Sequence, residues 1–89
     1  MSRERILDDV REILRTEFEV DSAAVVPATR LREDLDLDSI DAVALAARLE
    51  QLTGLFLKEE RLTRLRTVQD VVDLVSELSG RERERSANP

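Results

Sequence analysis

The chain contains neither cysteine nor histidine, and these two absences exclude several kinds of chemistry. Without cysteine there is no disulfide framework and no zinc–thiolate site, and without histidine there is no catalytic triad of the usual kind. No apolar run reaches the roughly eighteen residues of a membrane-spanning helix, and residues 1–5 lack the apolar core of a signal peptide. The sequence therefore predicts a cytoplasmic protein without membrane insertion.

Aromatic side chains are also scarce. Phe18 and Phe56 make up the 2% of aromatic residues, whereas apolar residues reach 42%, so the core must be aliphatic. The 89 residues are enough for one small domain with a core of marginal size. The net charge of −6 argues against binding to nucleic acid, which requires a basic face. We expect a monomer whose partners carry basic docking patches.

Apolar residues recur at steps of three and four in three segments, which predicts three main helices. Ser2 and Asp38 are suitable N-caps for the first two helices, and Gly54 and Gly80 are suitable stops for the last two. Residues 19–38 show no period and predict a long loop, and residues 55–57 predict a short buried link. The predicted helices cover residues 3–18, 39–53 and 67–80, with a turn or two of helix within residues 59–65.

These elements define an all-α fold, a small four-helix bundle of three main helices and one short helix. Its long loop lies between helices one and two. We assign residues 1–80 to the helical domain and residues 81–89 to a disordered charged tail, because that segment is polar and terminal.

An acidic block, EDLDLDSID at residues 33–41, lies near the middle of the chain. Asp34, Asp36 and Asp38 have the alternate spacing of a calcium-binding loop. Its sixth position should be glycine and is Ser39, and its twelfth should be glutamate and is Leu45, so an EF-hand is excluded. No metal site is expected here.

Ser39 is the one hydroxyl in this block. A nucleophilic serine needs a base, and Lys58, the single lysine of the chain, is not placed near it by any sequence pattern. We therefore expect no enzyme activity. Two interpretations remain: Ser39 is a residue that receives a modification at a helix start, or residues 38–41 are only a capping box on an unmodified acidic module that binds other proteins.

Residues 31–43 (LREDLDLDSIDAV) and 67–75 (TVQDVVDLV) resemble the attachment motif and the last helix of the acyl carrier protein family. The resemblance runs from about Ile6 to Leu78. It implies that Ser39 carries a covalent 4′-phosphopantetheine, with Asp38 before it and Ile40 and Asp41 after it positioning the second helix. The thiol of that cofactor would hold acyl or polyketide intermediates as thioesters, which explains why the protein needs no cysteine of its own.

The resemblance also implies partners: a phosphopantetheinyl transferase, an acyl-loading enzyme, and a ketosynthase and other enzymes of fatty-acid-like or type II polyketide biosynthesis. The predicted recognition residues are Asp38, Ile40, Asp41, Ala47, Arg48 and Glu50, and the predicted acyl-chain pocket is lined by Val43, Ala46, Ala47, Leu62 and Val72.

Several positions depart from the family pattern. Asp36 stands where glycine is usual, so either the loop geometry differs slightly or Asp36 adopts a positive φ. Ala44 and Gln51 replace common acids, and Arg48 adds a positive charge. Because rim charges mostly set association rate and partner choice, these changes predict a carrier dedicated to its own pathway. The DLDLDSIDAV form is similar to carriers of pigment-type and other type II polyketide clusters.

Overall fold

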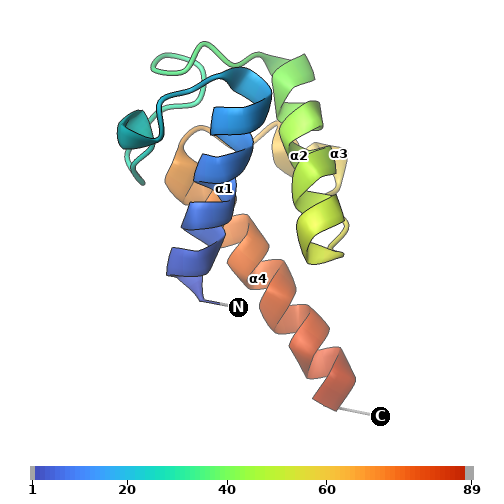
Figure 1. Cartoon of the computed structure of the whole chain (residues 1–89). Coiled ribbons are helices and arrows are strands. Elements are labelled where there is room, and N and C mark those ends of the chain that lie inside the picture. Colours follow the sequence, from blue (N-terminus) through green and yellow to red (C-terminus); the bar gives the residue numbers. More distant parts are fainter. Residues whose placement is uncertain (1, 88–89) are drawn as a thin grey trace.

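The computed structural model describes residues 2–87, and within that range the chain forms four α-helices, one 3₁₀ turn and no β-strand (Figure 1). The predicted bundle of three main helices and one short helix is confirmed. No helix of the described part is both long and apolar enough to cross a bilayer. The elements are α1 (Arg3–Phe18), η1 (Ser22–Ala24), α2 (Ser39–Thr53), α3 (Glu59–Leu62) and α4 (Val68–Ala87).

The core is aliphatic, as the scarcity of aromatic residues predicted. Helix α1 packs against both α2 and α4, and α3 lies beside α2. Phe18 is half-buried at the edge of the core and Phe56 is exposed. The buried apolar side chains are Ile6, Val10, Ile13, Leu14, Val25, Leu31, Leu37, Leu45, Ala46, Leu49, Leu55, Leu57, Leu62, Val68, Val71, Val72, Leu74 and Val75.

The helix starts follow from short capping motifs. The Ser2 side chain accepts a hydrogen bond from the Arg5 N–H, which confirms Ser2 as the N-cap of α1. At α2 the Asp38 carboxylate accepts from the Asp41 N–H at 2.9 Å, and the Asp41 carboxylate accepts from the Asp38 N–H at 3.1 Å. Both donors would otherwise lack an intrahelical partner, so this reciprocal pair fixes where α2 begins.

The second helix also ends where the sequence predicted. Gly54 adopts φ 74°, a left-handed conformation that disfavours side chains with a Cβ, and its N–H donates to the Glu50 carbonyl. The short link that follows was predicted to be buried throughout, and for Phe56 this is wrong. Leu55 and Leu57 are buried, whereas Phe56 is 73% exposed, because successive side chains of an extended segment point to opposite sides.

The last helix is longer than predicted. It does not end at Gly80 but continues to Ala87, and Gly80 has no positive φ that would stop a helix. The arginines and glutamates of residues 81–85 have good helix propensity and allow it to extend. Figure 1 shows this end of α4 running beyond the bundle. Residues 88–89 of the predicted tail lie outside the described residues.

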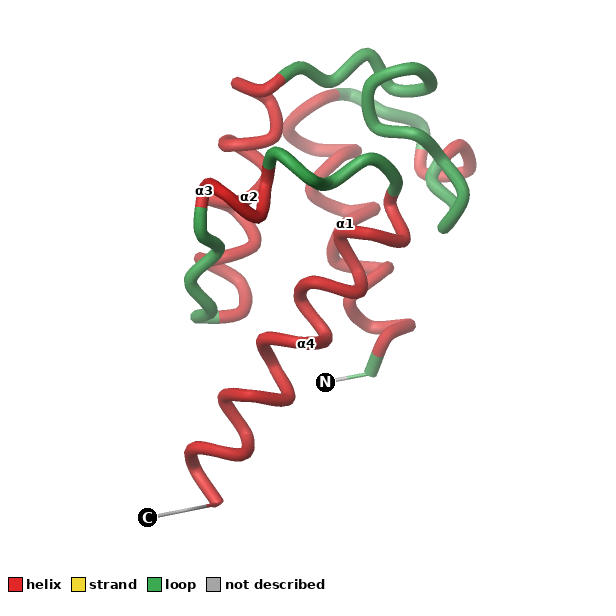
Figure 2. The backbone as a smooth tube through the Cα atoms, turned by 180° about the vertical axis from the view of Figure 1, so that it is seen from behind, coloured by secondary structure: helices red, strands yellow, loops and turns green. Residues whose placement is uncertain are grey.

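The long loop is held to the start of α4 by backbone hydrogen bonds, although its one helical element is the short η1 turn, which the sequence did not predict. The Leu31 N–H donates to the Arg66 carbonyl at 2.8 Å, the Val68 N–H to the Thr29 carbonyl at 2.9 Å, and the Gln69 N–H to the Pro27 carbonyl at 2.9 Å. We call this set the loop clamp. Figure 2 shows the loop crossing one end of the bundle before it enters α2.

A buried hydroxyl stabilises the same loop from within. Thr29 is 6% exposed, and its Oγ1 donates to the Ala24 carbonyl at 2.8 Å while accepting from the Val26 N–H at 3.0 Å. Buried polar groups need such partners. Together with the loop clamp, Thr29 explains how a long connection can stay ordered without regular secondary structure.

Asp36 adopts φ 57°, which confirms the positive-φ alternative at the position of the family's glycine. A left-handed residue with a Cβ costs about 1–2 kcal/mol, and aspartate tolerates it better than most. Its side chain forms no hydrogen bond among residues 2–87. The strain is therefore local to the residue.

The substitution Asp36→Gly is expected to raise the free energy of unfolding by about 0–1 kcal/mol, because relief of the strain is partly offset by the greater backbone entropy of glycine in the unfolded chain. Urea unfolding would measure it. Asp36→Ala is the matched control. Alanine keeps the left-handed backbone conformation but tolerates it less well than aspartate does, so this variant should be less stable than the wild type. Equal stability of both variants would contradict the argument.

Acid should weaken the fold, because hydrogen bonds lower the pKa of two loop carboxyls. The Asp41 N–H is the main cause of the lowered pKa of Asp38. For Asp34 the main causes of the lowered pKa are the Arg30 backbone N–H and then the Arg30 guanidinium. A pKa lower in the folded state means that the unfolded chain takes up protons first as pH falls. Their stabilisation is therefore present above about pH 5 and is lost as pH falls through and below the ordinary aspartate pKa of about 3.9.

Thermal midpoints measured between pH 7 and pH 3 test this expectation. Asp38→Asn is the informative variant, since asparagine caps a helix about as well as aspartate but does not ionise. It should lose less stability between pH 5 and pH 3 than the wild type does. An identical decline in both proteins would rule out Asp38 as a contributor.

Candidate functional site

Ser39 is the first residue of α2 and its side chain is exposed. Two elements position it. The capping pair Asp38–Asp41 fixes the helix start, and the buried Leu37, whose N–H donates to the Leu31 carbonyl at 3.0 Å, anchors the loop just before it. Within residues 2–87 the Ser39 hydroxyl forms no hydrogen bond. It is therefore presented to solvent with no other structural task.

An open groove of about 720 Å³ lies beside Ser39. Its floor is apolar and comes from the loop, from α2, and from α3 with the turn that follows it. Its rim carries charges of both signs. We call it the Ser39 groove; it is lined by Leu31, Arg32, Glu33, Leu37, Asp38, Ser39, Ile40, Ala42, Val43, Leu45, Glu59, Leu62, Thr63, Leu65 and Arg66.

Beneath the groove lies a much smaller apolar cavity of about 10 Å³ between α2, α3 and α4. Of the residues predicted to line an acyl-chain pocket, Val43 borders the groove, Ala46 borders the cavity, and Leu62 borders both. Ala47 and Val72 border neither. The α4 side chains that do face the cavity are Val71, Leu74 and Val75, since positions three and four apart share one helix face and Val72 lies about 100° away from Val71.

Helix α2 turns one apolar stripe outward. The sequence of α2 contains two adjoining apolar stripes, one of Ile40, Val43, Ala44 and Ala47 and one of Leu45, Leu49 and Leu52, and their spacing predicts that together they bury a wide arc of the helix. For the first stripe and for Leu52 this prediction is wrong. Only Leu45, Ala46 and Leu49 are buried, while Leu52 is 54% exposed. The exposed stripe begins next to Ser39 and consists of Ile40, which is 76% exposed, Val43, which is 49% exposed, Ala44 and Ala47.

Besides the capping pair Asp38–Asp41, two of the predicted recognition residues make contacts inside the chain. The Arg48 Nε lies 3.1 Å from a Glu17 carboxylate oxygen of α1, and its Nη1 donates to the Gln51 Oε1 at 2.7 Å. The Glu50 carboxylate accepts from the Leu57 N–H at 3.0 Å and so holds the link after α2. Asp38, Ile40 and Ala47 are exposed, and Asp41 is half-buried.

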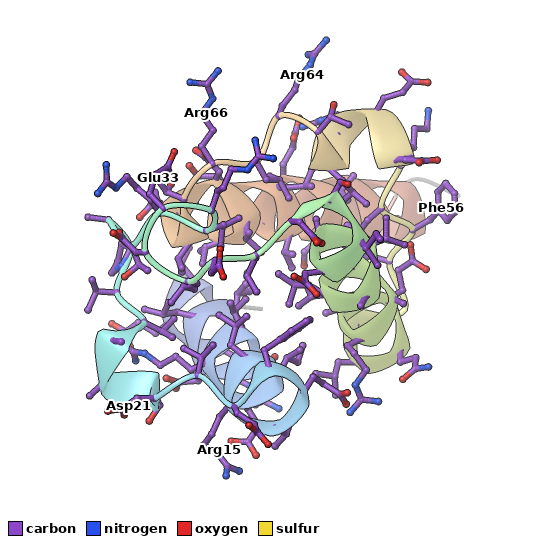
Figure 3. The ribbon with its side chains drawn as sticks, turned by 90° about the horizontal axis from the view of Figure 1, so that it is seen from above. Arg15, Asp21, Glu33, Phe56, Arg64 and Arg66 are labelled. Carbon is purple, nitrogen blue, oxygen red and sulfur yellow. The ribbon has the colours of Figure 1, made fainter. Side chains whose placement is uncertain are left out.

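Sequence reasoning missed Arg32 and Arg66, which lie on the rim of the Ser39 groove. The residues are far apart in the chain, and the loop clamp brings them together. Figure 3 shows Arg66 and Arg64 projecting away from the body of the bundle at the same edge. A useful signal was available in part: Arg32 directly precedes the acidic block of residues 33–41.

These surroundings suit Ser39 as a recipient rather than as a catalyst. Carboxylates and arginines surround it, and the chain has no histidine to take its proton. Among residues 2–87 no group of three or more carboxylates converges on a point that could hold a metal ion. An exposed hydroxyl at the mouth of a large groove does fit a long flexible prosthetic group attached through a phosphodiester.

Comparison with known proteins also indicates a protein that carries a covalently attached prosthetic group. Residues 8–75 match the family model described as "Phosphopantetheine attachment site". The chain is 45% identical over 78 residues to acyl carrier protein 2 of Ralstonia nicotianae, covering 88% of this chain and 96% of that protein. It is 39% identical over 77 residues to the acyl carrier protein of Rubrobacter xylanophilus, covering 86% and 95%.

A solved structure agrees as well. The crystal structure of an acyl carrier protein from Thermotoga maritima superposes with a TM-score of 0.81 at 26% identity, covering 91% of this chain and 94% of that one. The resemblance read from residues 31–43 and 67–75 is thus confirmed across most of the chain. The protein carries a covalently attached 4′-phosphopantetheine and acts as a carrier rather than as an enzyme: this chain belongs to the acyl carrier protein family.

Proposed function

We propose that Ser39 is the attachment site and that the protein holds acyl or polyketide intermediates as thioesters on the 4′-phosphopantetheine arm, shuttling them between enzymes of one dedicated fatty-acid-like or type II polyketide pathway. The observation that supports it is the exposed, unpartnered Ser39 hydroxyl at the mouth of the Ser39 groove. When bound, the cofactor supplies the thiol that forms the thioester. We further propose that it works in the cytoplasm.

The residues around Ser39 have separate tasks in this proposal. Asp38 and Asp41 fix the start of α2, so that the hydroxyl stays in one position for the transferase. The apolar floor of the groove, including Val43 and Leu62, can shelter a chain folded back from the arm. The small cavity beneath it is too small to admit an acyl chain unless helices move apart.

The partners we propose are a phosphopantetheinyl transferase, an acyl-loading enzyme and a ketosynthase. An exposed apolar stripe flanked by acids suits a docking surface that combines an apolar contact with a basic rim. Ile40 and Ala47 would make the apolar contact, and Asp38 and Asp41 would attract the basic rim. Arg48 and Glu50 would act indirectly, by holding α2 against α1 and against its following link.

Modification of Ser39 can be tested by mass spectrometry. The apo protein, incubated with coenzyme A and a broad-specificity phosphopantetheinyl transferase, should gain one phosphopantetheine, and Ser39→Ala should gain none. Alanine is a good helix former at this exposed position, so the variant should remain folded. No addition to the wild type would favour the unmodified acidic module, and addition to Ser39→Ala would place the site elsewhere.

Charge steering can be tested by the rate of the same reaction. Asp38→Asn with Asp41→Asn should slow modification on the order of tenfold at low ionic strength, because steering by charge raises association rates by about 10–10³-fold. The difference should shrink at high salt, where the Debye length is about 3 Å. Glu4→Gln with Asp9→Asn is the control, with the same charge change in the first half of α1, and Figure 1 shows α1 beginning at the opposite end of the bundle from the start of α2. An equal effect of both pairs would point to net charge alone.

A further inference from the structure

Attachment of the arm at Ser39 creates an electrostatic problem. A phosphodiester adds a negative charge at the Ser39 Oγ, and Glu33, Asp38 and Glu59 line the same groove, with Asp41 one turn into α2. Like charges at such short range repel each other. Asp38 and Asp41 cannot move away, since both carboxylates are fixed by the reciprocal capping bonds.

Two cations line the same groove, and their long side chains can turn toward this charge, although the Arg66 side chain projects away from the bundle in Figure 3. Arg32 and Arg66 both line the groove, and within residues 2–87 neither forms an ion pair or a side-chain hydrogen bond. Two other arginines nearby are already occupied: Arg30 pairs with Asp34 at 3.2 Å and Arg61 with Glu77 at 2.5 Å. Arg32 and Arg66 are therefore available for an added anion.

The backbone places the two arginines together. The loop clamp bonds Leu31 to Arg66 and so sets Arg32, the next residue, beside the turn that precedes α4. Arg32 also lies close enough to Asp38 for its charge to help lower the pKa of that carboxyl, although the Asp41 N–H is the larger cause. The Arg32 guanidinium is thus within electrostatic range of the residue that precedes Ser39.

We propose, on the basis of the function assigned to Ser39 above, that Arg32 and Arg66 bind the phosphodiester through which the arm is attached. A guanidinium presents planar, paired donors that match phosphate oxygens. Held in this way, the arm begins in the Ser39 groove, where the apolar floor lies, and away from Ala44 and Ala47, the part of the exposed stripe that does not line the groove. That part of the stripe then stays free for partner enzymes.

The experiment compares apo and modified protein by the Nε–Hε signals of the arginine side chains in ¹H–¹⁵N spectra. Water exchange of the Arg32 and Arg66 Hε protons should slow by about two- to five-fold on modification at low salt, the range of an exposed charge pair, and the slowing should shrink at high salt. Arg64 is the internal control, because it is exposed in the same turn but does not line the groove.

Variants make the test specific. In the modified protein, Arg32→Gln with Arg66→Gln should shift the ³¹P resonance and remove its salt dependence, whereas Arg64→Gln should leave both unchanged. All three residues are exposed, so the apo variants should keep the wild-type thermal midpoint. If the double variant fails to fold, the wild-type comparison of apo and modified protein decides alone.

The possible results distinguish the attachment proposal from the arginine proposal. An intact mass that shows no addition to the wild type overturns the attachment proposal and this one together. A verified addition with unchanged Arg32 and Arg66 signals, or with equal slowing at Arg64, overturns this proposal alone. Modified protein loaded with butyryl or succinyl groups identifies the anion: slowing that appears only with succinyl assigns the arginines to a cargo carboxylate and overturns binding of the phosphodiester.

Discussion

The loop clamp is the contact on which the rest of the structure depends. Three backbone hydrogen bonds tie residues 27–31 to residues 66–69, and without them the connection between α1 and α2 would have little to order it. They set the buried Leu31 and Leu37 into the core, which positions Asp38 and therefore the start of α2. The same bonds bring Arg66 to Arg32. Ser39 and the charges around it are thus arranged by a contact between distant parts of the chain.

Helix α2 contributes apolar residues to two surfaces, because only some of them pack in the core. Leu45, Ala46 and Leu49 face α1 and the small cavity, while the stripe that starts at Ile40 faces solvent. An exposed apolar stripe is unfavourable for an isolated protein and is typical of a surface that binds partners. The small cavity beneath the Ser39 groove indicates a well-packed interior in this state.

Local signals in the sequence predicted much of the fold. Helix α1 and the start and end of α2 follow from apolar periodicity and from the caps Ser2, Asp38 and Gly54, because capping depends on neighbours a few residues apart. The end of α4 was mispredicted for a related reason. Glycine often ends a helix by adopting a left-handed conformation. Gly80 does not adopt it, and the arginines and glutamates beyond it favour continued helix.

The sequence by itself determined the kind of site: an acidic block with one serine near its end, at a helix start, in a chain with no cysteine or histidine. These are matters of residue identity and short spacing, which local chemistry decides. Only the tertiary structure decided which apolar residues of α2 are buried, that Glu50 holds the link at Leu57, and that Arg32 and Arg66 line the same groove as Ser39. Such outcomes depend on long-range packing and on hydrogen bonds between segments far apart in the chain. The periodicity of apolar residues in the sequence reports local structure and does not predict them.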